Sequence, residues 1–328
     1  MTHIFQENPV TCAQVNACAY SHWSAYFKDH VPPAKVLLHV PELFLEYLQS
    51  ESIRLPPSNN AHMKANSDNE YSDWEDDDAP QENPVAAFSQ FHDRIQAVVS
   101  KWKKVFVKLN WSAPKDAKWI LVNYSLECSH VDDIYLLLNA SDHTAHDMNG
   151  HIYDECEDRD TGTRMRPEVV IKKYIRDFNP ALEFRVFVKK GHIIGVSQRD
   201  LNHYQFLEPL HEKLHALLEE FSTRVLSRSG FPLQRYIMDV YIASPYEIVT
   251  VIDVNPFTRK WNSLLFTWLE LLEKDTGSGF ELRLITETNL GAMGRRDHSE
   301  SQVPVEVVDA LRNSDAMVEL AREWLKLQ

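Results

Sequence analysis

The stretch Val251-Ile-Asp-Val-Asn-Pro-Phe257 ends an apolar run and places a carboxylate and an amide two residues apart. Residues i and i+2 of a β-strand point to the same side of the sheet, so Asp253 and Asn255 would share one face. Asp and Asn ahead of a proline are also frequent turn formers. Taken alone, the stretch leaves two interpretations open: a solvated turn at a strand end, or two oxygen ligands aimed at one cation.

The run just upstream favours the second interpretation. The sequence predicts a hairpin with strands over 236–243 and 247–254. Asp239 lies inside the first strand among apolar neighbours, and strand pairing could bring it beside Asp253 and Asn255. Mg²⁺ takes oxygen ligands and is commonly held by one or two carboxylates together with nucleotide phosphates. We therefore favour a metal site made of Asp239, Asp253 and Asn255 over a turn.

Basic side chains stand in two other predicted strands. Lys108 lies in a strand over 105–109, and Lys172 and Lys173 lie in one over 169–175. A buried strand lysine can bind a phosphate as a point charge, although a solvent-facing lysine on an edge strand is the simpler interpretation of each. The pattern does not decide which of Lys172 and Lys173 points inward.

A short loop follows the first of these lysines. The residues Ser112-Ala-Pro-Lys115 form a run whose backbone amides could cover phosphates, although neither GxGxxG nor GxxxxGK[ST] occurs in the chain. The alternative is an ordinary connection to a further strand, which we predict over 119–123.

A second predicted hairpin, over 183–198, carries two arginines. Arg185 alternates with apolar residues in its first strand, and Arg199 follows its second strand. A sheet arginine suits bidentate recognition of a phosphate. It suits equally a structural ion pair, for instance with Glu183 or Asp200, and the sequence leaves both possibilities open.

The remaining pattern indicates an α+β fold. Strands joined as hairpins and mixed with amphipathic helices are typical of antiparallel sheets with helices. A further strand is predicted over 35–38, and the predicted helices are 43–49, 88–104, 131–138, 204–229, 264–272 and 310–327.

Composition narrows the class of protein. A chain of 328 residues with 44% hydrophobic residues predicts a packed core in one large or two ordinary domains. The net charge of −14 argues against a general nucleic-acid binder. No apolar run is long enough to cross a membrane, the first thirteen residues lack a signal-peptide layout, and four scattered cysteines form no CxxC pair. We expect a cytosolic monomer with reduced thiols.

One segment, at about 56–84, stands apart from this globular pattern. Seven of the twelve residues over 67–78 are acidic, and no Lys or Arg lies between Lys64 and Arg94. Such a run repels itself and predicts a disordered acidic loop. A solvating role is the simpler interpretation, and a partner-binding segment anchored by Tyr71 and Trp74 is the alternative.

Several longer stretches together resemble the cell division cycle protein 123 family. They are Lys108-Leu-Asn-Trp-Ser-Ala-Pro-Lys-Asp-Ala117, Glu183-Phe-Arg-Val-Phe-Val188, Gly195-Val-Ser-Gln-Arg-Asp200, Asp253-Val-Asn-Pro-Phe257 and Ser263-Leu-Leu-Phe-Thr-Trp268. The similarity covers most of 18–270 and weakens after Gly279. One departure is visible, because the family pattern Asp-Phe-Asn-Pro-Phe has Val254 at its second position here, which leaves both ligands in place.

The family resemblance implies an ATP-grasp-like fold, in which two α+β lobes with antiparallel sheets grip ATP. We expect an N-terminal lobe over 1–165 that contains the acidic loop, a C-terminal ATP-grasp lobe over 166–290, and a C-terminal segment over 291–328. By the same resemblance, the nucleotide-binding residues are Lys108, Ala113, Lys115, Lys172, Lys173, Tyr174, Ile175, Arg185, Arg199, Asp239, Asp253 and Asn255. Within this set, the backbone of 173–175 would meet the adenine, and Asp239, Asp253 and Asn255 would hold Mg²⁺.

The role implied by the resemblance is that of a chaperone for the assembly of eukaryotic translation initiation factor two. Such a chaperone would bind the last domain of the gamma subunit and would be linked to cell proliferation through this step. Because most ATP-grasp proteins activate a carboxylate as an acyl phosphate, an ATP-dependent ligase is the alternative. A pure interaction module, in which the ATP residues serve stability alone, is a third possibility.

Overall fold

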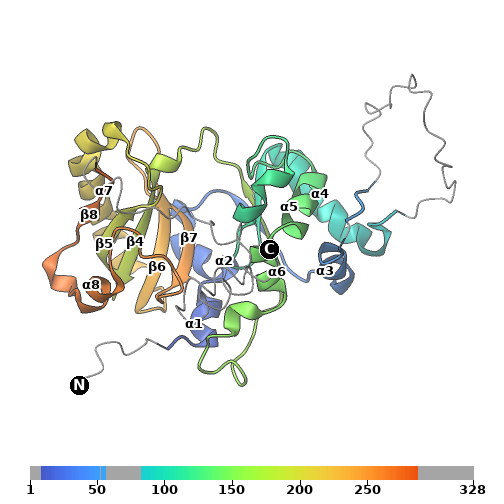
Figure 1. Cartoon of the computed structure of the whole chain (residues 1–328), viewed down its shortest axis with the longest axis horizontal. Coiled ribbons are helices and arrows are strands. Elements are labelled where there is room, and N and C mark those ends of the chain that lie inside the picture. The colour runs from blue at the N-terminus through green and yellow to red at the C-terminus, as the bar shows by residue number, and fades with distance from the viewer. Residues whose placement is uncertain (1–8, 52, 57–82, 287–328) are drawn as a thin grey trace, which may run out of the picture. The chain divides into compact units, whose positions relative to one another are not determined.

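The computed structural model describes residues 9–51, 53–56 and 83–286, which form two compact units (Figure 1). The five-stranded unit contains the described residues of 9–32, 152–164 and 175–286, and the three-stranded unit contains those of 33–151 and 165–174. The acidic segment, apart from its ends, and the C-terminal segment with its predicted helix lie outside the described residues.

The five-stranded unit is built on a sheet with the strand order β7-β6-β4-β5-β8. Its strands are β4 (Glu183–Lys189), β5 (His192–Gln198), β6 (Arg235–Tyr241), β7 (Thr250–Pro256) and β8 (Leu282–Arg283). Both predicted hairpins are present, as β4–β5 and β6–β7, and an antiparallel β4–β6 pairing joins them. Only the short β8 pairs in parallel, with β5. The predicted α+β fold class with antiparallel sheets is confirmed.

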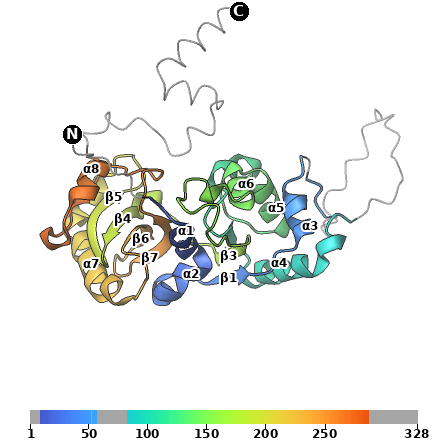
Figure 2. The same cartoon turned by 90° about the horizontal axis from the view of Figure 1, so that it is seen from below.

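Two helices cover opposite faces of this sheet, α7 (His211–Arg224) and α8 (Trp268–Glu273) (Figures 1 and 2). On the α8 face, Leu271 packs in one apolar cluster with Phe187 and Ile237. Gly195 permits this packing, because a Cβ atom there would lie 2.9 Å from the Phe266 ring. The α7 face is apolar by strand alternation.

The predicted helix over 204–229 is divided into three pieces. A 3₁₀ helix (Gln205–Leu210) contains Pro209 and precedes α7, and another short 3₁₀ helix (Leu226–Arg228) follows it. A proline has no amide hydrogen to donate and disfavours an α-helical residue before it, so the regular helix begins only after Pro209.

The N-terminal helices also belong to this unit. They are α1 (Cys12–Ala17) and α2 (Tyr20–Trp23), followed by a 3₁₀ helix (Ser24–His30), and all three contact β7. This packing explains why the observed division differs from the expected boundary at residue 165: the chain segments 9–32 and 152–164 pack with the second sheet.

The three-stranded unit has the strand order β1-β3-β2, all antiparallel. Its strands are β1 (Ala34–Leu37), β2 (Val105–Lys108) and β3 (Val169–Lys173), and its helices are α3 (Glu42–Leu48), α4 (Ser89–Trp102), α5 (Val131–Asn139) and α6 (Asp142–Met148). Val107 and Ile171 point from one face of the sheet into a core shared with Phe44, Ile95 and Tyr135 from the helices.

The strand predicted over 119–123 is wrong. Residues Lys115–Ile120 form a 3₁₀ helix, and Val122 and Tyr124 beyond it are exposed. The carboxylate of Asp116 accepts hydrogen bonds from the start of α6, which turns the chain toward that helix instead of along β2. The remaining 3₁₀ helices are Ala86–Phe88, His151–Tyr153, Pro180–Leu182 and Thr276–Ser278. Within the described ranges, no helix is both long enough and apolar enough to cross a membrane.

Candidate functional site

One face of the five-stranded sheet changes from apolar to charged along its strands. In β4, Phe187 packs in the core and Arg185, two residues earlier, lies among charged groups. The same change occurs in β6 from Ile237 to Asp239, while β7 places Asp253 directly opposite Asp239. Because residues two apart share a face, alternation puts the predicted ligands of three neighbouring strands on the α8 side of the sheet.

Asp239 is the centre of an ion-pair network on this face. Arg185 donates from Nε and Nη2 to the two carboxylate oxygens of Asp239, at 2.8 and 2.9 Å, and both side chains are at most 5% exposed. Arg199 donates to the same carboxylate at 3.2 Å and to Glu183 at 3.3 Å. The structure therefore contains the ion-pair alternative for both arginines, with Asp239 as the common partner.

Asp253 and Asn255 extend this network onto β7. Asp253 is partly exposed, and its charge together with burial raises the pKa of Tyr20 in α2 to about 12, burial being the larger cause. Asn255 is 2% exposed, and among the described residues its amide nitrogen is buried without a hydrogen-bond partner. A buried amide nitrogen without a hydrogen-bond acceptor is costly, so this nitrogen calls for an acceptor outside the described residues.

The donor set on this face fits a hard cation and a phosphate. Two carboxylates and one amide oxygen are the ligand types that Mg²⁺ takes, and the two arginines are suited to phosphate oxygens. Three carboxylates (Glu183, Asp239 and Asp253) and two guanidinium groups lie on this face. The predicted ligands Asp239, Asp253 and Asn255 thus share one face of one sheet.

The predicted lysines lie in the other unit. Lys108 in β2 pairs with Val170, and Lys172 in β3 pairs with Phe106, so the two lysines share the face of the three-stranded sheet opposite its helical core. Lys108 and Lys172 are 2% and 3% exposed, whereas Lys173 is exposed. The undecided choice between the two neighbouring lysines is settled in favour of Lys172 as the inward one.

The loop after Lys108 is bound by an aspartate side chain that the sequence pattern did not predict. Asp147 in α6 accepts hydrogen bonds from the amides of Trp111 and Ser112, at 3.3 and 2.7 Å, and from the Ser112 hydroxyl at 2.9 Å. Burial raises its pKa to about 6, against the opposing effect of the Ser112 hydrogen bonds. No residue pattern around Asp147 distinguishes it from any other helix aspartate.

Helix α6 also holds the other end of this loop. Asp116 accepts hydrogen bonds from the Ser141 hydroxyl at 2.6 Å and from the Asp142 amide at 2.8 Å. Between these two attachments, the Lys115 amide donates to the carbonyl of Ala113 at 2.7 Å. The amides of Trp111, Ser112 and Lys115 are therefore already paired with groups of the protein.

The segment predicted to meet an adenine follows β3. The amide of Lys173 donates to the Pro33 carbonyl at 2.8 Å, and that of Tyr174 donates to the Lys104 carbonyl at 3.0 Å. An adenine nitrogen that accepts a backbone hydrogen bond here would thus meet the amide of Ile175, the next residue. The expected role of 173–175 at the adenine stays a prediction.

The chain is similar in sequence to the members of one protein family. A family model described as D123 matches residues 23–311. The translation initiation factor eIF2 assembly protein of Vanderwaltozyma polyspora is 41% identical over 97% of this chain and 92% of its own.

Solved structures give the same relationship. The structure of Cdc123 from Schizosaccharomyces pombe matches with a TM-score of 0.69 and 31% identity, over 85% of this chain and 99% of that one. A RimK domain ATP-grasp protein from Sphaerobacter thermophilus also matches, over 74% of this chain and 58% of its own. Its TM-score of 0.33 and identity of 10% are too low to carry an argument.

Proposed function

The chain belongs to the D123 family, and from this premise we propose that it binds ATP with Mg²⁺ and promotes assembly of eukaryotic translation initiation factor two through its gamma subunit. The assembly role is supported by the relative from Vanderwaltozyma polyspora, which is named for it and matches along 97% of the chain. A cytosolic site of action and a link to the cell division cycle are parts of the same proposal.

The observation that carries the nucleotide part is the charged face around Asp239. Asp239, Asp253 and Asn255 would hold Mg²⁺, and the amide nitrogen of Asn255, a donor without a partner among the described residues, would suit a phosphate oxygen. Bound Mg²⁺ neutralises phosphate charge and orients the phosphate chain. Arg185 and Arg199 would move part of their hydrogen bonding from carboxylates to phosphate oxygens.

The lysines of the three-stranded unit would add cationic groups for the phosphates. Lys108 and Lys172 share one face of that sheet and are buried, and an ammonium group can bind a phosphate as a point charge. Ala113 and Lys115 would contact the phosphates from the loop, and Tyr174 and Ile175 would frame the adenine. These roles follow the family resemblance, residue by residue.

Capture of the partner by the purified full-length chain tests this function. Immobilised C-terminal domain of the gamma subunit is expected to retain the wild-type chain, and retention is expected to fall when Asp253→Asn removes one of the two carboxylate charges of the proposed Mg²⁺ site. Asp29→Asn, at an exposed position of the same unit, is the matched control and should behave as wild type.

The outcomes separate the candidates. No retention of the wild-type chain with or without Mg–ATP would overturn the partner proposal. Equal retention of wild type and Asp253→Asn would show that the charged face does not serve assembly. Release of ADP only in the presence of an amine and a carboxylic acid would instead establish the ligase alternative.

A further inference from the structure

Two chain segments far apart in sequence lie side by side at the start of α1. Val10 and Cys156 form a parallel β-bridge, and the Glu157 amide donates to the Val10 carbonyl at 3.0 Å. The Asp158 carboxylate then accepts from the Cys12 amide at 2.7 Å. Backbone and side-chain hydrogen bonds thus fix residues 10–12 against 156–158.

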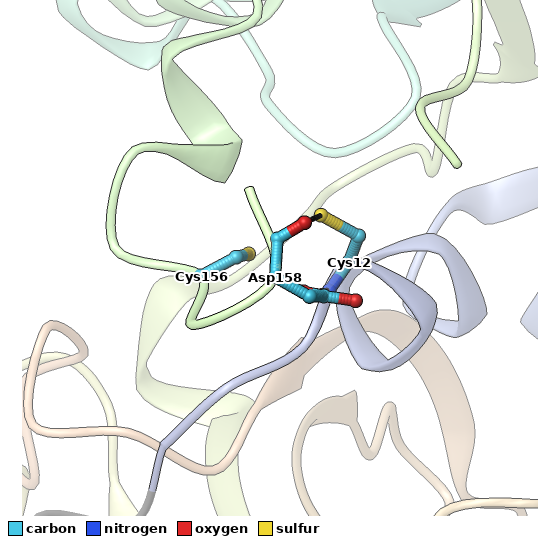
Figure 3. Close-up of side chains that lie close together, drawn as sticks. All are labelled: Cys12, Cys156 and Asp158. Atoms are coloured by element: carbon cyan, nitrogen blue, oxygen red, sulfur yellow. Dashed lines mark hydrogen bonds between the residues drawn. The ribbon is translucent and has the colours of Figure 1, made fainter. Parts of the chain in front are cut away.

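This arrangement gathers three metal-ligand side chains, separate from the charged face of the sheet (Figure 3). The sulfur atoms of Cys12 and Cys156 and a carboxylate oxygen of Asp158 all lie within 4.8 Å of one another. Cys12 is 0% and Cys156 is 5% exposed, while Asp158 is partly exposed. The approach depends on Gly162, where a Cβ atom would lie 2.6 Å from the Cys12 sulfur.

We propose that Cys12, Cys156 and Asp158 bind one Zn²⁺ ion. Two thiolates and a carboxylate are ligands that Zn²⁺ accepts, with Zn–S distances of about 2.3 Å and Zn–O distances of about 2.0–2.2 Å. At the tetrahedral angle, two ligand atoms at these lengths lie about 3.6–3.8 Å apart. The ligand atoms, which lie within 4.8 Å of one another, would therefore move closer by at most about 1 Å, and the partly exposed Asp158 gives an entry path.

Zinc binding would exchange protons for metal and involves no oxidation. Both S–H bonds break, two Zn–S bonds form, and two protons leave to solvent for each ion bound. Because both thiols must lose a proton to bind the ion, binding is expected to strengthen as pH rises.

The consequence of binding would be structural. The ion would tie the first turn of α1 to the segment 152–164, and α1 contacts β7, the strand that carries Asp253 and Asn255. Asp158 accepts the hydrogen bond from the Cys12 amide without a metal as well. Only the two thiolate contacts would therefore be specific to the metal-bound state.

Cobalt titration of the full-length chain tests the proposal. The reduced, chelator-treated chain is titrated with Co²⁺ alone, because Co²⁺ replaces Zn²⁺ and gives a thiolate-to-metal absorption band. We expect one equivalent of Co²⁺, release of two protons, and displacement by Zn²⁺. Cys12→Ser and Cys156→Ser should lose the band, whereas Cys18→Ser and Cys128→Ser, which change the other two buried cysteines, should keep it.

Asp158→Asn provides a variant whose side chain lies partly at the surface. It should keep the circular dichroism of the wild type and bind Co²⁺ about tenfold or more weakly. No thiolate band in the wild type would overturn the proposal. A band that survives both Cys12→Ser and Cys156→Ser would do the same, as would a Cys12–Cys156 disulfide that persists in reductant and blocks metal uptake.

Discussion

Asp239 is the centre of a buried ion-pair network and is also a proposed Mg²⁺ ligand. It is 2% exposed and accepts hydrogen bonds from Arg185 and Arg199, so its charge is compensated without any ligand. A buried ion pair of this kind contributes little compared with an apolar pair, but removal of one partner leaves a buried charge unpaired. In the proposed function, the carboxylate and guanidinium groups of this network would also contact Mg²⁺ and phosphate.

Replacement of Arg185 by alanine should destabilise the five-stranded unit strongly. Loss of the bidentate partner removes two of the hydrogen bonds that Asp239 accepts, and breaking a buried pair costs about 3–5 kcal/mol of unfolding free energy. Urea unfolding measures this cost. Arg224→Ala is the control, because its ion pair with Glu220 is on the surface of α7 and such pairs contribute less than about 1 kcal/mol. A loss for Arg185→Ala no larger than that of the control would refute a buried, tightly coupled network.

At the scale of elements, α6 holds the loop that follows β2. Asp116 in the loop binds the start of the helix, and Asp147 in the helix binds the loop amides of Trp111 and Ser112. The loop conformation is fixed by these carboxylates without a glycine-rich sequence. In the proposed function, this attachment positions Ala113 and Lys115 for the phosphates.

Asp147→Asn should change the pH dependence of stability in a defined direction. Burial raises the pKa of Asp147 from 3.8 to about 6. The folded state therefore binds the proton more tightly than the unfolded state, and the resulting stabilisation is lost as pH rises between these values. The unfolding free energy of the wild type minus that of the variant should fall by about 2 kcal/mol from pH 4 to pH 6 and level off above about pH 7.

The control for this measurement lies on the same helix. Asp142→Asn changes an exposed aspartate of α6 and should give no comparable decline between pH 4 and pH 6. A wild-type minus Asp147→Asn difference that is constant or rises over this range would contradict the buried carboxylate.

Local patterns predicted the elements that bury one clear face, and missed those set by distant polar contacts. The alternation around Arg185 and the apolar run ending at Asn255 predicted β4 and β7, and with them the shared face of the ligands. The strand predicted over 119–123 failed because the hydrogen bonds of Asp116 to α6 decide the path of that segment. Asp147 was missed for the same reason, since its partners are about 35 residues away in sequence.

At the scale of the whole molecule, the chain divides into two units whose segments alternate along the sequence. Each unit has its own sheet. The proposed cation ligands all belong to the five-stranded unit, and the buried lysines belong to the three-stranded unit. Segments 9–32 and 152–164 join the five-stranded unit through contacts that no local pattern reveals, so a boundary at residue 165 followed naturally from sequence order alone.

Calorimetric titration of ATP into the full-length chain, with Mg²⁺ and then with Mg²⁺ removed by chelation, tests the central claim most directly. We expect saturable binding with Mg²⁺ and weak or no binding without it. Asp253→Asn should weaken Mg–ATP binding about tenfold or more, which is at least about 1.4 kcal/mol, while Asp29→Asn should match the wild type. Absence of ATP binding in both conditions, or equal affinity in wild type and Asp253→Asn, would contradict the account.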